Sequence, residues 1–337
     1  MNPSRDKKAL GVPLKGIGIS SSLLLLIVLL ASLPTPVFAQ KCGAAGKEIR
    51  SVQSNAFDEY PALNDVKQGL LLMLYGRGTA DCPEELYSFA MEGKAFLTLF
   101  DETYRLSLSN NTSDRLAAMN HARTLEEKVS SMQQQKTLGA TALDVATSAR
   151  IALTDFFINQ GQINEREGGL ANRTRDKIAH YRLATMAYEA ADENILAANT
   201  RLKWETLEEE YTTDMERADE YFTKAEYLME NAQILSSIPT KIDAYVKVME
   251  ALDLYESALF YYVLHNEDEK IVETKSRIND AKSEMAYLKK TLLLYFAVLA
   301  VLLVGIALYL LNRLLAWRQD TYEYYLGNEL IKVRGVE

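Results

Sequence analysis

The side chains of this sequence that could do chemistry are few and widely spaced. The three histidines, His121, His180 and His265, are at least 59 residues apart, and none belongs to a His-Glu-x-x-His zinc motif. No Gly-x-Ser-x-Gly nucleophile elbow, phosphate-binding glycine loop or cysteine–histidine pair occurs. Acidic runs such as Glu208 to Glu210 are more typical of a solvated helix face than of paired catalytic acids. The sequence therefore predicts no catalytic residue, no metal site and no cofactor, and we expect a protein that is not an enzyme.

Cys42 and Cys82 are the only cysteines of the chain. An even pair in an oxidising compartment most simply forms one disulfide. A metal or redox site would need closer spacing or histidine partners. A bond between them would close a loop of about 41 residues, for which chain entropy gives a stabilisation of about 4 kcal/mol. The pair therefore predicts a structural disulfide.

The amino terminus has the order of a secretory signal peptide. Four basic residues precede an apolar run of 11 residues, Leu23 to Leu33, and two prolines follow it. Small residues at the −3 and −1 positions then predict cleavage after Ala39, so that residues 1–39 form the signal peptide. The alternative is an uncleaved anchor, because the apolar stretch from Ile17 to Leu33 is almost long enough to span a membrane.

A second apolar run lies near the carboxyl terminus. Residues 291–311 are 21 residues without a charge, and a helix of that length crosses the hydrocarbon core of about 30 Å. The residues expected at the two membrane interfaces are Lys289, Lys290, Arg313, Trp317 and Arg318. Basic residues on both sides leave the positive-inside rule undecided. The signal peptide predicts the orientation instead: a single-pass protein of the cell membrane, with the helical domain outside the cytoplasm and residues 312–337 as a short cytoplasmic tail.

The chain is acidic, with 37 basic and 46 acidic residues and a formal net charge of −9. The acidity belongs to residues 40–290, which hold 29 basic and 41 acidic residues. A nucleic-acid-binding protein needs a basic face to neutralise phosphates. The balance therefore argues against a nucleic-acid partner, and solvated helix faces explain the acid.

The region between the two apolar runs has helical periodicity and no alternating strand pattern. A glycine-rich stretch, residues 161–172, is predicted to be a loop and is the clearest internal boundary. We expect an N-terminal helical subdomain over residues 40–160 and a long-helix, coiled-coil-like region over residues 173–290. Four helices are predicted in the first subdomain. The first covers residues 54–75, the second starts at Pro83, the third covers residues 114–138 and the fourth covers residues 142–159.

Beyond residue 172 the apolar spacing averages 3.5 residues, which is typical of helices that pack along their whole length. An uninterrupted helix over residues 172–236 would be about 98 Å long. The three stripes are Ala184, Tyr188, Ala191, Ile195, Ala198 and Leu202; Met215, Ala218, Phe222, Ala225, Met229 and Ala232; and Tyr245, Val248, Leu252, Tyr255, Leu259 and Tyr262. The predicted fold class is all-α, an extracytoplasmic helical bundle with long coiled-coil or repeat-like hairpins, plus one C-terminal transmembrane helix.

Three asparagines fit the Asn-x-Ser/Thr triplet of glycosylation acceptors: Asn110, Asn111 and Asn172. Each lies in a predicted loop of the exported region, where the triplet is accessible to modification. They are candidate glycosylation sites.

The function expected from these features is that of a membrane-anchored extracytoplasmic scaffold or adaptor. Tyrosine-rich and small-residue stripes suit contacts with protein partners or self-association through helices, and residues 291–311 hold the chain to the membrane. One alternative is a sensor or receptor subunit whose helical domain binds a ligand. Its difficulty is a tail of 26 residues, too short for a signalling domain. Another alternative is an accessory subunit of a membrane enzyme complex.

Overall fold

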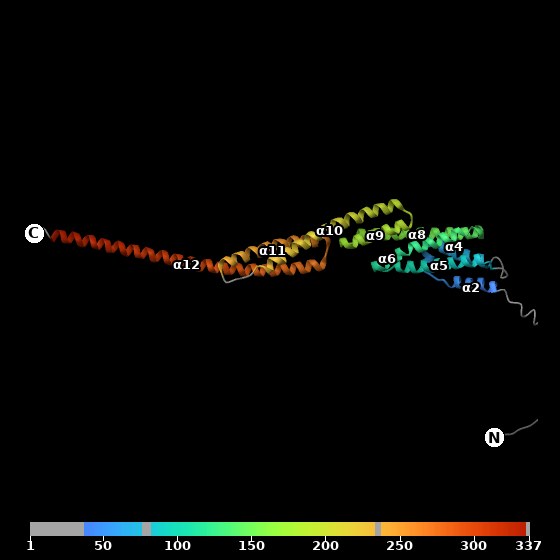
Figure 1. Cartoon of the computed structure of the whole chain (residues 1–337), viewed down its shortest axis with the longest axis horizontal. Coiled ribbons are helices and arrows are strands. Elements are labelled where there is room, and N and C mark those ends of the chain that lie inside the picture. Colours follow the sequence, from blue (N-terminus) through green and yellow to red (C-terminus); the bar gives the residue numbers. More distant parts are fainter. Residues whose placement is uncertain (1–36, 76–81, 233–236, 335–337) are drawn as a thin grey trace, which may run out of the picture. The chain divides into compact units, whose positions relative to one another are not determined.

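The structure is a computed structural model that describes residues 37–75, 82–232 and 237–334. Within these ranges all regular structure is helical and no strand occurs, as the sequence predicts (Figure 1). The chain divides into two compact units. Unit 1 comprises Met1–Asn159 with Ala190–Asp192, and unit 2 comprises Gln160–Glu189 with Glu193–Glu337.

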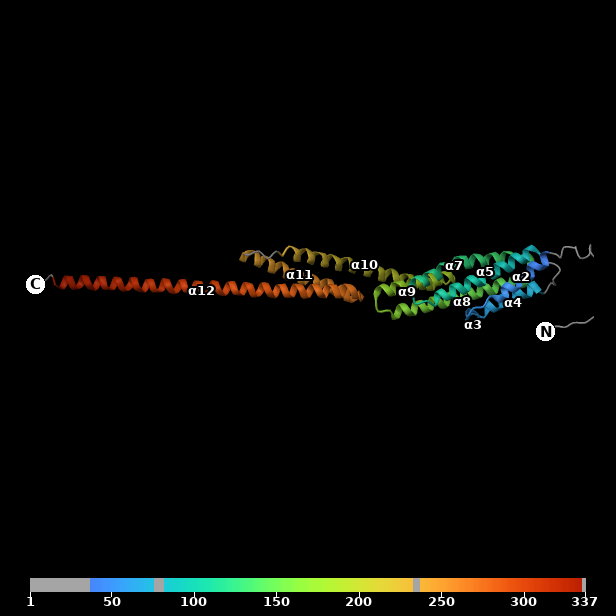
Figure 2. The same cartoon turned by 90° about the horizontal axis from the view of Figure 1, so that it is seen from below.

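Unit 1 is built around one long helix, α5, which packs against its neighbours on several sides. Its helices are α2 (Val37–Ser51), α3 (Ala56–Glu59), α4 (Ala62–Tyr75), α5 (Glu84–Ser107), α6 (Thr112–Asn120), α7 (Ala122–Gln134), the short 3₁₀ helix η1 (Lys136–Leu138) and the first part of α8 (Ala140–Leu170). Helix α5 contacts α2, α4, α6 and α7, and both views show α4 and α5 side by side (Figures 1 and 2). Each helix buries one apolar face in a shared core.

An aromatic cluster forms the centre of this core. The ring centroids of Tyr60 and Phe156 are 5.6 Å apart, and those of Phe100 and Phe156 are 5.1 Å apart. Polar ends of the cluster are satisfied by one carboxylate, because Tyr104 Oη donates to Glu59 Oε2 over 2.8 Å and Asn159 Nδ2 donates to Glu59 Oε1 over 3.1 Å. Burial of large rings whose polar ends keep partners is a strong source of stability.

The first predicted helix, residues 54–75, is interrupted. Tyr60 has φ −119° and ψ 83°, outside the helical region, and α4 begins at Ala62. The residue before a proline is disfavoured in helical geometry, so Pro61 divides α3 from α4. The predicted buried face is nevertheless correct: Phe57, Tyr60, Leu63, Val66, Leu70 and Leu74 are all buried. The helix predicted over residues 114–138 is likewise divided at His121 and ends at Gln134.

The predicted disulfide is present. Cys42 on α2 and Cys82, two residues before α5, are bonded with their Cα atoms 5.9 Å apart, and both are buried. The bond joins the amino-terminal helix of unit 1 to the start of its central helix. Residues 1–36 of the predicted signal peptide lie outside the described residues, and the predicted cleavage point after Ala39 falls in the first turn of α2.

The loop predicted over residues 161–172 is wrong for most of its length, since α8 continues as helix to Leu170. Its glycines serve close packing instead. A Cβ atom on Gly161 would lie 2.5 Å from the Tyr188 ring, so only glycine lets the helix carrying Tyr188 approach this closely. The two units still meet in sequence at Gln160, beside this glycine, but inside a helix.

The single helix considered over residues 172–236 is also absent. The structure has α9 (Thr174–Ala190) and α10 (Asn194–Glu230), separated by Asp192 with φ +61°. Aspartate tolerates this left-handed conformation better than most residues. The first predicted stripe is therefore cut in two: Tyr188 is buried, whereas Ile195 beyond the turn is 77% exposed.

The other two stripes pack against each other in unit 2. Helix α11 (Ile238–His265) lies between α10 and α12 (Asp268–Arg334), and neighbours in this layer run antiparallel (Figures 1 and 2). Tyr255 and Tyr262 on α11 are buried, and their hydroxyls donate to Glu226 over 2.5 Å and to Asp219 over 2.6 Å. The buried residues shared by α10, α11 and α12 include Ala218, Ala225, Val248, Ala251, Ala258, Ile278 and Ala281.

Helix α12 continues from this layer through the predicted membrane span without a break. Its first part contributes Ile278, Ala281 and Leu288 to the core of unit 2. Among the described residues it is the one helix long and apolar enough to cross a membrane, within Asp268–Arg318. Its apolar side chains from Phe296 to Trp317 are exposed to the surroundings rather than packed in the protein.

The position of the disulfide in unit 1 leads to a stability prediction. Cys42→Ala, Cys82→Ala and the double variant should each lower the free energy of unfolding by about 4 kcal/mol, because each removes the same loop closure. Hydrogen exchange followed by mass spectrometry should show lost protection in α2, α4 and α5, with the single and double variants alike. Two free thiols in the native protein, or unchanged protection in all three variants, would contradict this account.

Candidate functional site

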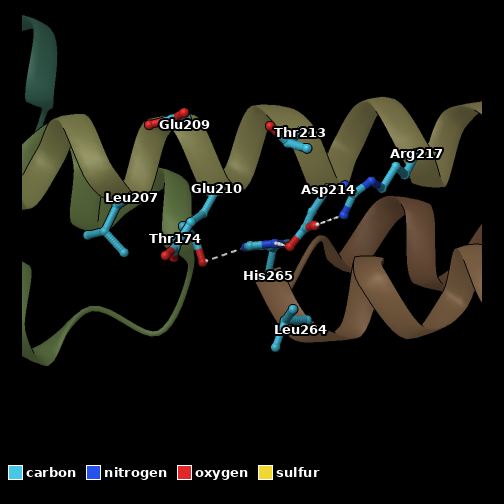
Figure 3. A pocket seen from close by; sticks show the side chains of 9 residues that line it. All are labelled: Thr174, Leu207, Glu209, Glu210, Thr213, Asp214, Arg217, Leu264 and His265. Atoms are coloured by element: carbon cyan, nitrogen blue, oxygen red, sulfur yellow. Dashed lines mark hydrogen bonds and ion pairs between the residues drawn. The ribbon is translucent and has the colours of Figure 1, made fainter.

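The candidate site is a cavity of about 470 Å³ in unit 2 (Figure 3). Its volume is within the range of small-ligand pockets. It lies where the start of α9 and the end of α11 meet the middle of α10. The residues that line it are Thr174, Leu207, Glu209, Glu210, Thr213, Asp214, Arg217, Leu264 and His265.

The carboxyl-terminal end of α11 sets the position of His265. Asn266 follows in the left-handed conformation, with φ 57° and ψ 45°, and asparagine is the commonest substitute for glycine at such a helix end. The Glu267 amide then donates back to the Tyr262 carbonyl over 3.0 Å, which closes the last turn. Asn266 Nδ2 also donates to the Asn172 carbonyl over 3.0 Å, so the turn before α12 is tied to the turn before α9.

His265 links three helices through its two ring nitrogens. Its Nδ1 lies 3.0 Å from Thr174 Oγ1 at the start of α9, and its Nε2 lies 3.1 Å from Asp214 Oδ2 on α10. The side chains of Thr174, Asp214 and His265 point toward one another in the cavity (Figure 3). The imidazole is 6% exposed, so water cannot replace both contacts.

The donor and acceptor roles in this chain follow from the carboxylate. An ionised Asp214 only accepts hydrogen bonds, so Nε2 of His265 carries a proton. In the neutral imidazole Nδ1 then accepts, and the Thr174 hydroxyl donates to it. A hydroxyl, an imidazole and a carboxylate in series are also the components of a nucleophilic triad. Here the two hydrogen bonds of the chain join α9, α10 and α11.

Tyr211 on α10 packs beside this chain. Its ring stands edge-on to the His265 imidazole, with centroids 5.3 Å apart, and its hydroxyl donates to Glu267 over 2.8 Å. Burial first, and then this hydrogen bond, raise the pKa of Tyr211 to about 12. The phenol therefore stays protonated at neutral pH and holds the first residues after α11 to α10.

The chemistry of the cavity wall is mixed. Leu207 and the half-exposed Leu264 supply apolar surface, while Glu209 and Glu210 are exposed acids at its edge. Arg217 Nη1 lies 3.6 Å from Asp214 Oδ1, and its positive charge partly neutralises that carboxylate. The wall is therefore suited to an apolar group that carries a basic neighbour.

A second cavity, of about 510 Å³, lies between the start of α9, the middle of α10 and the start of α12. Charges of both signs line it, among them Arg175, Glu216 and Lys270. Arg173 forms an ion pair with Asp268 at this place. Tyr211 and Glu267, which are hydrogen-bonded to each other, also line this second cavity.

The structure leaves the other predicted site residues away from this cavity. The candidate glycosylation residues Asn110, Asn111 and Asn172 are exposed, and the Asn111 side chain caps α6 by accepting from the Ser113 amide over 3.0 Å. The residues predicted at the membrane interfaces are exposed on α12 at either end of its uncharged run: Lys289, Lys290, Arg313, Trp317 and Arg318.

The three histidines lie in separate places, and sequence analysis did not identify the partners of any of them. His121 Nδ1 is 3.0 Å from Thr103 Oγ1 in unit 1, and His180 Nδ1 is 3.5 Å from Glu167 in unit 2. No spacing rule brings together Thr174, Asp214 and His265, because they come from three helices and are 40 and 51 residues apart. Among the described residues, no group of three or more histidine, cysteine or acidic side chains is placed to hold a metal ion.

Comparisons with family models, with curated proteins and with solved structures found no match to this chain.

The hydrogen-bond chain at His265 predicts a coupled effect on stability. Thr174→Val should lower the free energy of unfolding of unit 2 by about 1–3 kcal/mol, because a buried ring nitrogen loses its donor. The same substitution should cost clearly less in a His265→Leu background, where that nitrogen is absent. Urea titration followed by Trp204 fluorescence, in a Trp317→Phe background, measures both values.

The matched control is Thr206→Val, on the exposed face of α10, where the hydroxyl bonds only within its own helix. It should change stability by less than about 0.5 kcal/mol. Equal costs of Thr174→Val with and without His265 would show that the two side chains are not coupled.

Proposed function

We propose that this protein is a membrane-anchored scaffold or adaptor, which presents an extracytoplasmic helical domain to protein partners. The observation that carries the proposal is the double role of α12. Its first part is a packed helix of unit 2, and its continuation is the apolar segment with exposed side chains. A domain built on the membrane helix itself has no linker to relax its position.

Two further features support the location. The Cys42–Cys82 disulfide suits an oxidising compartment, and the leader sequence predicts export. On this proposal residues 40–290 stand outside the cytoplasm and residues 312–337 inside.

The internal packing of unit 2 restricts where partners bind. The tyrosine and small-residue stripes of α10 and α11 are already buried against each other and α12. Exposed apolar side chains remain at the end of α11 farthest from the apolar segment: Phe260, Val263 and Leu264. They adjoin the candidate cavity through Leu264. We propose that this surface binds a protein segment with an apolar side chain next to a basic one, which the Glu209 and Glu210 edge would attract.

A non-catalytic role accords with the chemistry of the site. The Thr174–His265–Asp214 chain joins three helices, and Thr174 and His265 are both buried. Adaptor function needs only a stable surface at a fixed distance from the membrane. A role as accessory subunit of a membrane enzyme complex is one form of the same proposal.

A sensor is the second candidate, and the position of the cavity favours it. The cavity includes the last residues of α11, and α12 begins three residues after His265. A ligand there would press on the turn that leads into the helix crossing the membrane. Sensing, unlike scaffolding, requires the cytoplasmic tail to respond.

The two candidates differ in what the tail and the α11 surface contribute. Leu264→Asp should reduce recovery of the bound partner from native membranes by about tenfold or more, because a charge replaces an apolar contact. Deleting residues 320–337 should leave surface level and partner recovery unchanged. Quantitative mass spectrometry of the purified complex, with wild type as reference, measures both.

Leu72→Asp in unit 1 is the matched control, since Leu72 is also an exposed apolar residue, and it should leave partner recovery unchanged. An unchanged partner set after Leu264→Asp would refute the proposed surface. Loss of the cellular phenotype on tail deletion, with normal surface level and contacts, would favour the sensor.

A further inference from the structure

The first three turns of α11, residues 238–249, carry an exposed apolar stripe. Its members recur every three or four residues and so share one face of the helix. Their side chains are between 38% and 46% exposed, and they are Ile238, Ile242, Val246 and Met249. A row of four such residues facing water is costly for a soluble surface.

Contacts between α11 and α12 fix the level of this stripe along the membrane helix. Lys241 Nζ donates to Tyr295 Oη over 3.3 Å and lies 4.7 Å from the centre of that ring. Farther from the apolar run, Lys282 Nζ on α12 is 3.3 Å from Glu256 Oε1 on α11. Because the two helices run antiparallel and rise about 1.5 Å per residue, Ile238 lies level with about residue 298 and Met249 with about residue 287.

These levels coincide with the junction between the charged part of α12 and its apolar run. Lys289 and Lys290 are the last charges before the uncharged residues begin at Thr291. The start of α11 therefore reaches about 10 Å beyond the level of Thr291. Helix α10 ends earlier, at Glu230, and Lys247 bonds to the Asn231 carbonyl just after that end. Beyond this level α11 and α12 continue without α10.

Past the level of the membrane junction, two charged residues interrupt this face of α11. The next residues on the same face of α11 are the exposed acids Asp253 and Glu256. The buried cation of the region, Lys241, is 8% exposed and directed to Tyr295, so it adds no charge to the stripe. Asp253 and Glu256 thus separate the apolar stripe beside the apolar run from the exposed apolar side chains at the other end of α11, which are Phe260, Val263 and Leu264.

We infer that residues 238–249 of α11 are embedded in the lipid headgroup and upper acyl region beside α12, with Ile238, Ile242, Val246 and Met249 facing lipid. Amphipathic helices enter this zone by about 5–10 Å, which matches the reach of α11. The inference rests on the proposed membrane anchorage by α12. On this arrangement unit 2 is held by two adjacent elements, and its tilt on the membrane is restricted.

Spin labels on single added cysteines test the inference in the full chain, because both native cysteines are joined in a disulfide. Labels go on Ile242→Cys and Val246→Cys, with Val263→Cys as a matched position at the other end of α11 and Leu303→Cys in the apolar run. The protein is reconstituted in phosphatidylcholine vesicles, and collision with oxygen, which concentrates in lipid, is compared with collision with a water-soluble nickel chelate.

We expect oxygen collisions to dominate at 242, 246 and 303, and nickel-chelate collisions to dominate at 263. Nickel access at 242 and 246 equal to that at 263 would overturn the inference, while a lipid signal at 303 would leave the anchorage intact. Protection of 242 and 246 from both reagents would mean that a protein surface, such as a second copy, covers the stripe, and would also overturn it. A water signal at 303 would instead refute the anchorage.

Discussion

The packing of α11 against α12 is the constraint on which the arrangement of unit 2 depends. The first part of α12 packs in unit 2, and its later part is the apolar run. A helix that packs against the first part therefore has a fixed position relative to the apolar run. Ala251 and Ile278 lie in one buried cluster, and the Lys241–Tyr295 contact extends the same packing to the edge of the apolar run. The turn at Asn266 returns the chain from α11 to α12 within a few residues, which leaves little freedom to slide.

The buried tyrosines give this packing its specificity. A tyrosine in a helix interface fills a large volume and also needs an acceptor for its hydroxyl. Tyr255 and Tyr262 each donate to a carboxylate on α10, and Tyr211 on α10 donates to Glu267 in the turn between α11 and α12. Shifting one helix by a turn would leave a hydroxyl and a carboxylate unpaired, which costs more than the loss of apolar contact alone. The acidity of the region thus has a structural use besides solubility.

Much of the fold was predictable from periodicity, because apolar spacing reports which face of a helix is buried. The helical class, the buried face from Phe57 to Leu74, and the stripes on α10 and α11 follow from it. Breaks were harder to predict. Asp192 ends a helix in a left-handed conformation, although no glycine or proline marks this position in the sequence. Gly161, in contrast, lies inside a continuous helix, where it allows close packing with Tyr188. Local composition does not distinguish these two uses.

The candidate site was not predictable at all from the sequence. Thr174, Asp214 and His265 come together only because two turns, at Asn172 and at Asn266, are hydrogen-bonded to each other in the folded unit. Such a site depends on tertiary packing, and no spacing along one helix encodes it. The cysteine pair is the opposite case, since a count of two was enough to predict the bond.

The most direct test of the account measures the continuity of α12 across the membrane junction. Spin labels on Ser276→Cys and Leu299→Cys, one in the packed part and one in the apolar run, should give a single narrow distance of about 35 Å by electron–electron double resonance in lipid nanodiscs, as an unbroken helix requires. A shorter or broad distribution would mean that the helix bends or unwinds at the junction. The bundle would then have no fixed level above the membrane, and the central claim would fail.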